Sequence, residues 1–290
     1  MLADDPMGIR QFTRDDIDFA VHQTAIEGWF YTPVELERML RMDPEGSFVY
    51  EQGGERLGFV TTVTYGRTGV IGHLIVDKKG RGKKIGDSLV RAAVDYMSGR
   101  GVDSMLLYAT AEGVKIYQRY GYRTGDEIWC IHSYLDQIAD RTASPLCTPI
   151  AREDLETIGA VDTELFGDDR SRLMKSLYEE FPEHAFKIER HGRIDGYVFG
   201  RPNPTGYDLG PWICLTEDIA DADALFRTAL AHAAQGTLYV GVFFKNRAAC
   251  QIAERLPKMR TWRIPLMIRG EQRYTSGMNK IFGITAFELG

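Results

Sequence analysis

A short basic loop between a buried strand and an amphipathic helix constrains this 290-residue sequence more than any other feature. Residues 68–77, TGVIGHLIVD, form a dense apolar run that predicts a central strand covered on both faces. Apolar residues recur at helical spacing through residues 85–96. The loop at 78–86, KKGRGKKIG, directs backbone N–H groups and the positive end of the helix dipole toward one spot. The pattern predicts an α/β fold with an anion site at this junction.

Five cations crowd into this loop, although the whole chain is acidic. They are Lys78, Lys79, Arg81, Lys83 and Lys84, in a chain with a formal net charge of −6 from 35 basic and 41 acidic residues. A charge run by itself is more often a solvated turn, and on charge alone that interpretation stays open. The acidic background nevertheless favours a local anion site over a basic face for nucleic acid, so we expect no nucleic-acid partner.

Glycines make the loop suitable for a diphosphate. Gly82 and Gly86 lack a Cβ atom where phosphate oxygens must approach the main chain. Arg81, Lys83 and Lys84 add side-chain charge at the same place. The spacing is neither the GxGxxG of a Rossmann dinucleotide site nor the GxxxxGK[ST] of a P-loop, so both of those sites are disfavoured.

Composition and chain length exclude several classes of protein. A hydrophobic content of 44% with 26% charged residues is typical of a globular chain, and no apolar run approaches the ~18–20 residues that span a bilayer. The start, MLADDPMGIRQF, lacks the basic flank and apolar core of a secretory signal. Cys130, Cys147, Cys214 and Cys250 are too dispersed for a zinc site or a disulfide framework. We therefore expect a cytoplasmic protein with no metal and no membrane association.

The predicted order of elements occurs twice. The first half reads as a strand, two helices, several strands, the basic loop with its helix, a strand, a short helix and a last strand. Residues 138–150 lose this periodicity and contain Pro145 and Pro149, which suit a linker. The second half repeats the order less clearly and with negligible sequence identity. We predict a mixed α/β fold duplicated in tandem, with domains at 1–140 and 146–290.

The loop resembles the acyl-CoA loop [QR]xxGx[GA] of the GNAT superfamily of N-acetyltransferases. Residues 81–86, RGKKIG, begin five positions after Val76, at the end of the predicted strand. Lys84 replaces the middle glycine of the motif. Its backbone N–H can still serve a ligand if the residue has helical φ and ψ.

A second match follows about 30 residues downstream, in ATAEGVKIYQRYGY. Tyr117 lies on a predicted short helix and is followed by Gly121-Tyr122, which resembles the family's Tyr and Gly-Phe or Gly-Tyr pair. An isolated tyrosine would more often pack through its ring. Two motifs in the family's order favour the functional interpretation.

The resemblance implies the fold and the cofactor. Each domain would be a mixed, mostly antiparallel sheet flanked by helices, and the first would bind acetyl-CoA as co-substrate. The residues that the resemblance assigns to acetyl-CoA are Leu74, Ile75, Val76, Arg81, Gly82, Lys83, Lys84, Ile85, Gly86, Asp87, Thr110 and Tyr117.

The resemblance also implies direct attack of an amine on the thioester. A backbone N–H of the strand at 74–76 would stabilise the oxyanion, and Tyr117 would protonate the departing thiolate. His73, on the same strand, is a candidate base with a suitable intrinsic pKa, and a histidine satisfied inside the sheet is an equal alternative. Other family members use a Glu near the position of Met105 or a water relay, and Thr110 occupies the place of a frequent Asn.

The second half is expected to lack the cofactor. Aligning Cys214 with Val76 places Ile219 at the position of Arg81, with four carboxylates at 217, 218, 221 and 223 around it. A diphosphate would meet like charge there. Arg170 and Trp212 resemble acceptor-pocket residues of degenerate GNAT-like domains, although a salt bridge at a helix start is the more frequent role for Arg170 and a core position for Trp212. Asn246 stands where the first half has Thr110.

These features together predict an acetyl-CoA-dependent N-acetyltransferase that acts on a primary amine of a small molecule. Two alternatives remain open, namely a protein or peptide acetyltransferase and a catalytically silent acyl-CoA sensor. The acceptor, the acyl-chain preference and the oligomeric state do not follow from the sequence.

Overall fold

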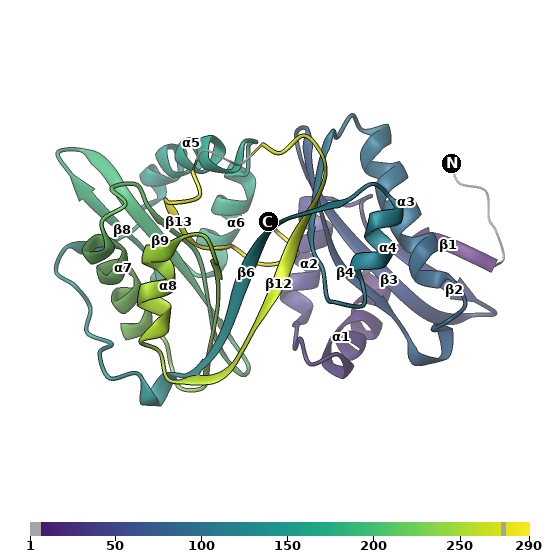
Figure 1. Cartoon of the computed structure of the whole chain (residues 1–290), viewed down its shortest axis with the longest axis horizontal. Helices are drawn as coiled ribbons and strands as arrows, with labels where there is room; N and C mark the ends of the chain where they lie inside the picture. The colour runs from purple at the N-terminus through teal and green to yellow at the C-terminus, as the bar shows by residue number, and fades with distance from the viewer. Residues whose placement is uncertain (1–6, 274–276) are drawn as a thin grey trace. The chain divides into compact units, whose positions relative to one another are not determined.

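The computed structural model describes residues 7–273 and 277–290 of the chain (Figure 1). The strands are β1 (Met7–Gln11), β2 (Phe48–Gln52), β3 (Glu55–Tyr65), β4 (Thr68–Val76), β5 (Ser104–Tyr108), β6 (Arg123–Tyr134), β7 (Cys147–Pro149), β8 (Ala185–Arg190), β9 (Arg193–Asn203), β10 (Gly206–Cys214), β11 (Thr237–Phe243), β12 (Lys258–Gly270) and β13 (Ile281–Gly283). The α-helices are α1 (Ile17–Ile26), α2 (Pro33–Met42), α3 (Ile85–Gly99), α4 (Val114–Arg119), α5 (Leu155–Phe166), α6 (Ser171–Glu180), α7 (Ile219–Ala231) and α8 (Arg247–Glu254). The expected mixed α/β class is confirmed.

Contacts divide the chain into two units. The N-terminal unit contains the described residues up to Arg123, together with Met267–Glu271 and Leu289. The C-terminal unit contains Thr124–Leu266 and most of the remaining C-terminal residues. Strand β12 therefore begins in the C-terminal unit and ends in the N-terminal one. The consecutive domains at 1–140 and 146–290 remain a prediction.

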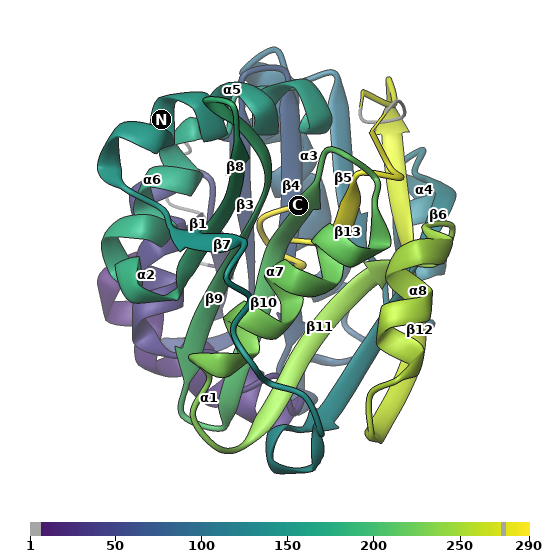
Figure 2. The same ribbon diagram turned by 90° about the vertical axis from the view of Figure 1, so that its left-hand side faces the viewer.

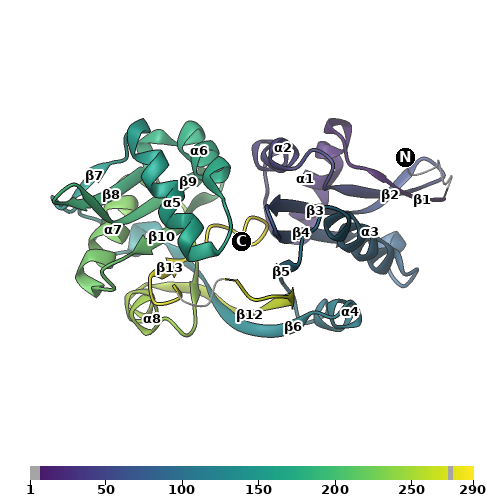
Figure 3. The same cartoon turned by 90° about the horizontal axis from the view of Figure 1, so that it is seen from above.

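In the N-terminal unit, strands β1 to β5 lie in chain order and the end of β12 follows β5. The strand pairs from β1 to β4 are antiparallel, and β4 and β5 are parallel. Figure 3 shows α1 and α2 on one face of β3 and β4 and α3 on the other. Phe59 and Ile75 belong to the core on the α1–α2 face, and Leu89 and Leu107 belong to the core on the α3 face.

The sequence pattern explains why α3 packs as it does. Ile85, Leu89 and Ala93 are buried and Tyr96 is half-buried, as the helical spacing of these residues predicts. This stripe faces β3 and β4. Burial of the stripe fixes the start of α3 at the end of β4, where the basic loop lies.

In the C-terminal unit, the sheet order is β6, β11, β10, β9, β8 and β7, and β13 pairs with β10. Helix α7 lies against β8, β9 and β10 (Figure 2). The element order from β7 to α8 repeats the order from β1 to α4, with two helices, three strands, a helix, a strand and a helix after the first strand. The predicted tandem repetition of one fold is confirmed.

No helix in the described ranges combines the length and the apolar character needed to cross a membrane. Within the same ranges, no group of three or more His, Cys, Asp or Glu side chains is placed to hold a metal ion.

Candidate active site

Strands β4 and β5 pair at one end only. The described register joins Thr68–Ile71 to Ser104–Leu107 and stops there. On the other side of β4, the register with β3 shifts, so that β4 carries one extra residue between Gly72 and Ile75. His73 lies in this bulge with a φ of 41°. Because a bulge bends a strand and ends its pairing, the backbone of 74–76 leaves the ladder on the side away from β3.

The loop after β4 is ordered by side chains of its own unit. Asp77 accepts a hydrogen bond from the backbone N–H of Lys79 at 2.8 Å and another from Nε2 of Gln23 at 2.9 Å. Residues Lys78–Gly80 form a short 3-10 helix. These contacts tie the loop to α1 and hold it against the end of β4.

The start of α3 is open to a ligand. Lys84 is the N-cap residue and makes no capping hydrogen bond with its side chain. The N–H groups of the first helical residues, Ile85, Gly86 and Asp87, have no intrahelical partner by geometry. Gly82 has a φ of 80°, and a Cβ atom placed there would meet nothing within 4 Å. An uncapped helix start of this kind suits an anion.

Lys84 does not meet the condition of helical φ and ψ. Its φ is 63° and its ψ is 13°, which is the left-handed region. A left-handed residue costs about 1–2 kcal/mol for an L-amino acid other than glycine. The chain thus keeps the backbone path that a glycine would adopt at this motif position without strain, and the lysine adds a charge there.

The loop cations divide into paired and unpaired groups. Lys79 pairs with Glu55, and Arg81 pairs with Glu27 while its Nε donates to the carbonyl oxygen of Val76 at 3.1 Å. Within the described ranges, no carboxylate pairs with the three remaining cations, which are Lys78, Lys83 and Lys84. The loop therefore keeps net positive charge beside the open helix start.

Asp87 and Thr110 are predicted ligand residues that here stabilise α4. The carboxylate of Asp87 accepts a hydrogen bond from Arg119 at 2.6 Å, and this bond lowers the pKa of Asp87. The carbonyl oxygen of Thr110 accepts from the N–H groups of Gly113 and Val114 at 3.0 and 3.2 Å. The bond from Arg119 ties α4 to the first turn of α3, and the bonds to Thr110 hold the start of α4.

Tyr117 is buried on α4, and burial raises the pKa of its phenol. A Cβ atom at Gly113 would lie 3.1 Å from Cε2 of Tyr117, so the glycine leaves room for the ring. The ring lies edge-on to Tyr122 with centroids 5.9 Å apart. Both tyrosines belong to the core on the α3 face. The phenol therefore stays protonated at neutral pH.

His73 lies on the opposite face, with the α1–α2 core. Its Nδ1 is 2.9 Å from Oγ1 of Thr61, and its ring stacks on Phe59 with centroids 6.3 Å apart. Tyr31 meets the same ring edge-on at 4.2 Å. The structure therefore brings His73 to the connection between α1 and α2 and holds it among aromatic rings.

Sequence reasoning missed Tyr31 as a neighbour of His73. The available signal was the aromatic run Trp29-Phe30-Tyr31 between two predicted helices. Trp29 and Phe30 are 40% and 52% exposed, which is high for such large apolar side chains.

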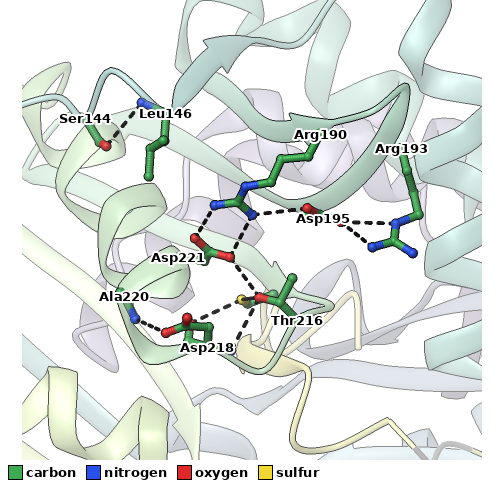
Figure 4. A network of polar contacts seen from close by, with 10 residues as sticks. Ser144, Leu146, Arg190, Arg193, Asp195, Thr216, Asp218, Ala220 and Asp221 are labelled. Carbon is green, nitrogen blue, oxygen red and sulfur yellow. Dashed lines mark hydrogen bonds and ion pairs between the residues drawn. The ribbon is translucent and has the colours of Figure 1, made fainter.

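The corresponding loop of the C-terminal unit is closed by its own side chains (Figure 4). Asp218 caps α7 by accepting from the backbone N–H two residues further on at 2.8 Å. Asp221 accepts from both Nη atoms of Arg190 at 2.7 and 2.9 Å and from the hydroxyl of Thr216 at 3.0 Å. Two of the four acidic residues noted in the sequence, Asp218 and Asp221, thus bind the helix start and an arginine of the same unit.

Arg170 and Trp212 both belong to the core of the C-terminal unit. Nε and Nη2 of Arg170 each donate to the carboxylate of Asp162 at 2.9 Å, and the guanidinium lies 4.0 Å from the ring centroid of Phe166. Trp212 is fully buried and donates to the carbonyl oxygen of Ala222 at 3.1 Å. Arg170 thus makes a salt bridge at the start of α6 and Trp212 lies in the core, as the more frequent role of each residue predicts.

Comparisons with known protein families assign the chain to a family. Residues 14–122 match the acetyltransferase (GNAT) family, and residues 158–283 match an acetyltransferase (GNAT) domain. The chain belongs to the GNAT family of acetyltransferases. It is a tandem GNAT protein and an acyltransferase, as the resemblance implied.

Two sequence relatives and one solved structure illustrate the range of GNAT proteins similar to this chain. The uncharacterised N-acetyltransferase YitH of Bacillus subtilis is 26% identical over 220 residues, which cover 74% of each chain. A mycothiol acetyltransferase of Streptomyces bingchenggensis is 34% identical over 87 residues, 28% of each chain. A crystal structure from Pyrococcus horikoshii, described as a proposed acetyltransferase, has a TM-score of 0.83 at 18% identity and covers 100% of this chain and 98% of that one. The last likeness concerns the fold alone.

Proposed function

We propose that the N-terminal unit binds acetyl-CoA and transfers its acetyl group to a primary amine of a small molecule. The observation that carries this proposal is the open, cationic start of α3 directly after a strand whose edge is unpaired. The helix start suits the diphosphate of CoA. The unpaired backbone of 74–76 suits an extended ligand with amide groups, because such a ligand can hydrogen-bond to a free strand edge.

The reaction is direct attack of the amine nitrogen on the thioester carbonyl, which forms the amide bond and breaks the carbon–sulfur bond. An N–H of the unpaired backbone at 74–76 donates to the carbonyl oxygen as negative charge develops on it. Tyr117 gives its phenolic proton to the sulfur of CoA. The phenol of Tyr117 carries the proton at neutral pH, since burial raises its pKa.

The amine must lose a proton before or during attack. His73 accepts this proton, directly or through water, and the contact between its Nδ1 and Thr61 fixes the ring orientation. Its place on the α1–α2 face supports entry of the amine from the side that carries Tyr31. Loss of the acidic limb from the pH–rate profile of His73→Ala tests this assignment, because turnover that depends on a basic group rises with pH.

The small-molecule class of acceptor rests on the relatives. One of them is named for mycothiol, a small molecule, although it matches only part of this chain. Release of CoA thiol, measured against a panel of small amines and of peptides with lysine or N-terminal amines, tests the class. Turnover on peptides alone would favour a protein acetyltransferase, and acetyl-CoA binding without any turnover would favour a sensor.

Tyr117→Phe tests the mechanism most directly. We expect turnover to fall at least tenfold, the lower range for loss of a general acid, with acetyl-CoA affinity nearly unchanged. Tyr178→Phe is the matched control, because it removes the same hydroxyl from a half-buried ring on α6. Wild-type turnover of Tyr117→Phe would remove Tyr117 from the role of general acid.

A further inference from the structure

Exposed apolar side chains gather at the connection between α1 and α2. Among the described residues, eight large apolar side chains are strongly exposed, and four of them lie between positions 26 and 34. These four, which we call the apolar patch, are Ile26, Trp29, Phe30 and Val34, and they are between 40% and 52% exposed. A single exposed apolar side chain is ordinary, whereas a group of them marks a binding surface.

Hydrogen bonds fix the backbone on both sides of this connection. At the end of α1, the N–H of Trp29 donates to the carbonyl oxygen of Thr24 at 2.9 Å. At the start of α2, the N–H of Thr32 donates to the carboxylate of Glu35 at 2.7 Å. Only two residues lie between these bonds. The apolar patch is therefore a fixed part of the surface and not a frayed segment.

Phe30 has a backbone conformation that disfavours any side chain. Its φ of 52° lies in the left-handed region, which costs about 1–2 kcal/mol for an L-amino acid other than glycine. The position nevertheless carries a large ring that is mostly in contact with water. Residues held against both preferences concentrate at active sites and ligand clamps. The strain at Phe30 therefore points to a ligand for its ring.

The apolar patch is continuous with the surroundings of the candidate base. Tyr31 directly follows Phe30, and its ring meets the ring of His73 edge-on with centroids 4.2 Å apart. The strand β4 holds His73 in its bulge, so the position of this contact is set by the sheet. An acceptor whose amine nitrogen reaches His73 can therefore rest the remainder of its structure on the apolar patch.

The connection offers no charge to an acceptor. Residues 28–33, GWFYTP, contain no ionisable carboxylate or cation. Of the flanking carboxylates, Glu27 pairs with Arg81 and Glu35 caps α2 through the N–H of Thr32. A polyamine, an aminoglycoside or a lysine-rich peptide carries further ammonium groups, and carboxylates are their strong partners. The connection therefore suits an apolar acceptor better than a polycation.

We propose that Trp29 and Phe30 determine the specificity for the acceptor, and that the acceptor is a primary amine on an aromatic or aliphatic body. This inference rests on the proposed function and names the substrate class of the same site. The two rings remove apolar surface of the acceptor from water while its nitrogen faces His73. Binding therefore strengthens with the apolar area of the acceptor.

Unbranched primary alkylamines from ethylamine to hexylamine test the substrate class. Each added CH₂ group should raise kcat/KM about two- to threefold, because complete burial of a CH₂ group gives about fourfold and the patch covers only one side of the chain. Hexylamine should thus exceed ethylamine about 15- to 80-fold in kcat/KM. Spermidine, which carries further ammonium groups, should be a poorer acceptor than hexylamine.

Trp29→Gln/Phe30→Asn tests the two residues. Asparagine tolerates the left-handed region, so the backbone at position 30 is kept while the ring is lost. We expect kcat/KM to fall about 10- to 30-fold for hexylamine and less than about threefold for ethylamine, with the KM for acetyl-CoA and the melting temperature unchanged. Tyr134→Gln is the matched control, because it removes a 41% exposed ring from the C-terminal unit. It should keep the full dependence on chain length.

Three outcomes would overturn this inference while the proposed function stands. The first is a higher kcat/KM for spermidine than for hexylamine, and the second is a dependence on chain length that survives in the double variant. The third is a change of oligomeric state in the double variant, measured by sedimentation velocity, with an unchanged alkylamine series, because the apolar patch would then be a contact between copies of the chain. Absence of acetyl transfer to every amine tested would overturn the proposed function itself.

Discussion

The two units contain the same junction of a strand, a loop and a helix, but only one of them leaves it open. The start of α3 has no side-chain cap and has Lys83 and Lys84 beside it. The start of α7 is capped by Asp218, and Asp221 in its first turn is bound to Arg190. The start of α3 therefore keeps free N–H groups and positive charge. At the start of α7, side chains of the same unit cap the helix and bind the carboxylate of its first turn.

The strands in front of these helices differ in the same way. Beyond Ile71, β4 has no described partner on its β5 side. In the C-terminal unit, β13 pairs with β10 at Trp212 and Ile213, and the N–H of Cys214 donates to the carbonyl oxygen of Lys280 at 2.9 Å. The chain itself occupies the strand edge that the N-terminal unit leaves unpaired.

Asn246 holds this inserted segment. Its Nδ2 donates to the carbonyl oxygens of Met278, Asn279 and Ile281 at 3.3, 3.0 and 3.0 Å. The equivalent position in the N-terminal unit is Thr110, which is exposed. A duplicated ligand site can thus be lost in two ways: a segment of the chain itself can pair with the strand edge, and the cations of the loop can be replaced. We accordingly expect one acetyl-CoA per chain.

The largest effect should come from reversing the loop charge. In Lys83→Glu/Lys84→Glu, two carboxylates replace cations at the open helix start, and acetyl-CoA affinity should fall about 30- to 100-fold. Titration calorimetry measures the affinity and gives the stoichiometry, which should be one in the wild type. Asp218→Asn in the C-terminal unit is the matched control and should change neither value. A stoichiometry of two would contradict the conclusion that the C-terminal unit does not bind acetyl-CoA. Unchanged affinity in the double variant would contradict the role of the loop charge.

The sequence predicted the fold because the fold rests on local signals. The spacing of Ile85, Leu89 and Ala93 predicted α3. The glycines and lysines before it indicate an anion site, which stays a prediction. The left-handed conformation of Lys84 was not predicted. The dihedral angles of this residue, which replaces the glycine of the motif, are set by how β4 before it and α3 after it pack. Proximity between distant segments was also missed, because no local pattern relates the end of β12 to β5.

The next effect concerns the stability of the C-terminal unit. Asn246 is buried, and Asn246→Ala removes the side-chain hydrogen bonds to three carbonyl oxygens and the cap that its Oδ1 gives to α8. Each hydrogen bond contributes about 0.5–1.5 kcal/mol and the cap about 1 kcal/mol, so the free energy of unfolding should fall by at least about 2 kcal/mol. Chemical denaturation of the full chain measures this change. Thr110→Ala is the matched control and should leave the unfolding free energy within about 0.5 kcal/mol of wild type. Equal stability of the two variants would mean that Asn246 does not hold the segment.

The smallest effect separates backbone from charge at the open helix start. Lys84→Gly relieves a left-handed lysine, which is worth about 1–2 kcal/mol, but glycine also makes the unfolded chain more flexible by about 0.4–1 kcal/mol. We expect a net gain in unfolding free energy of about 0.5 kcal/mol, whereas Lys83→Gly, with no positive φ to relieve, should be destabilising. Because the left-handed turn keeps the N–H groups of α3 in place in Lys84→Gly, its acetyl-CoA affinity should fall only about two- to fivefold, as for the loss of one exposed charge. A loss as large as that of the double charge reversal would show that the side chain of Lys84 does most of the binding and that the open helix start contributes little.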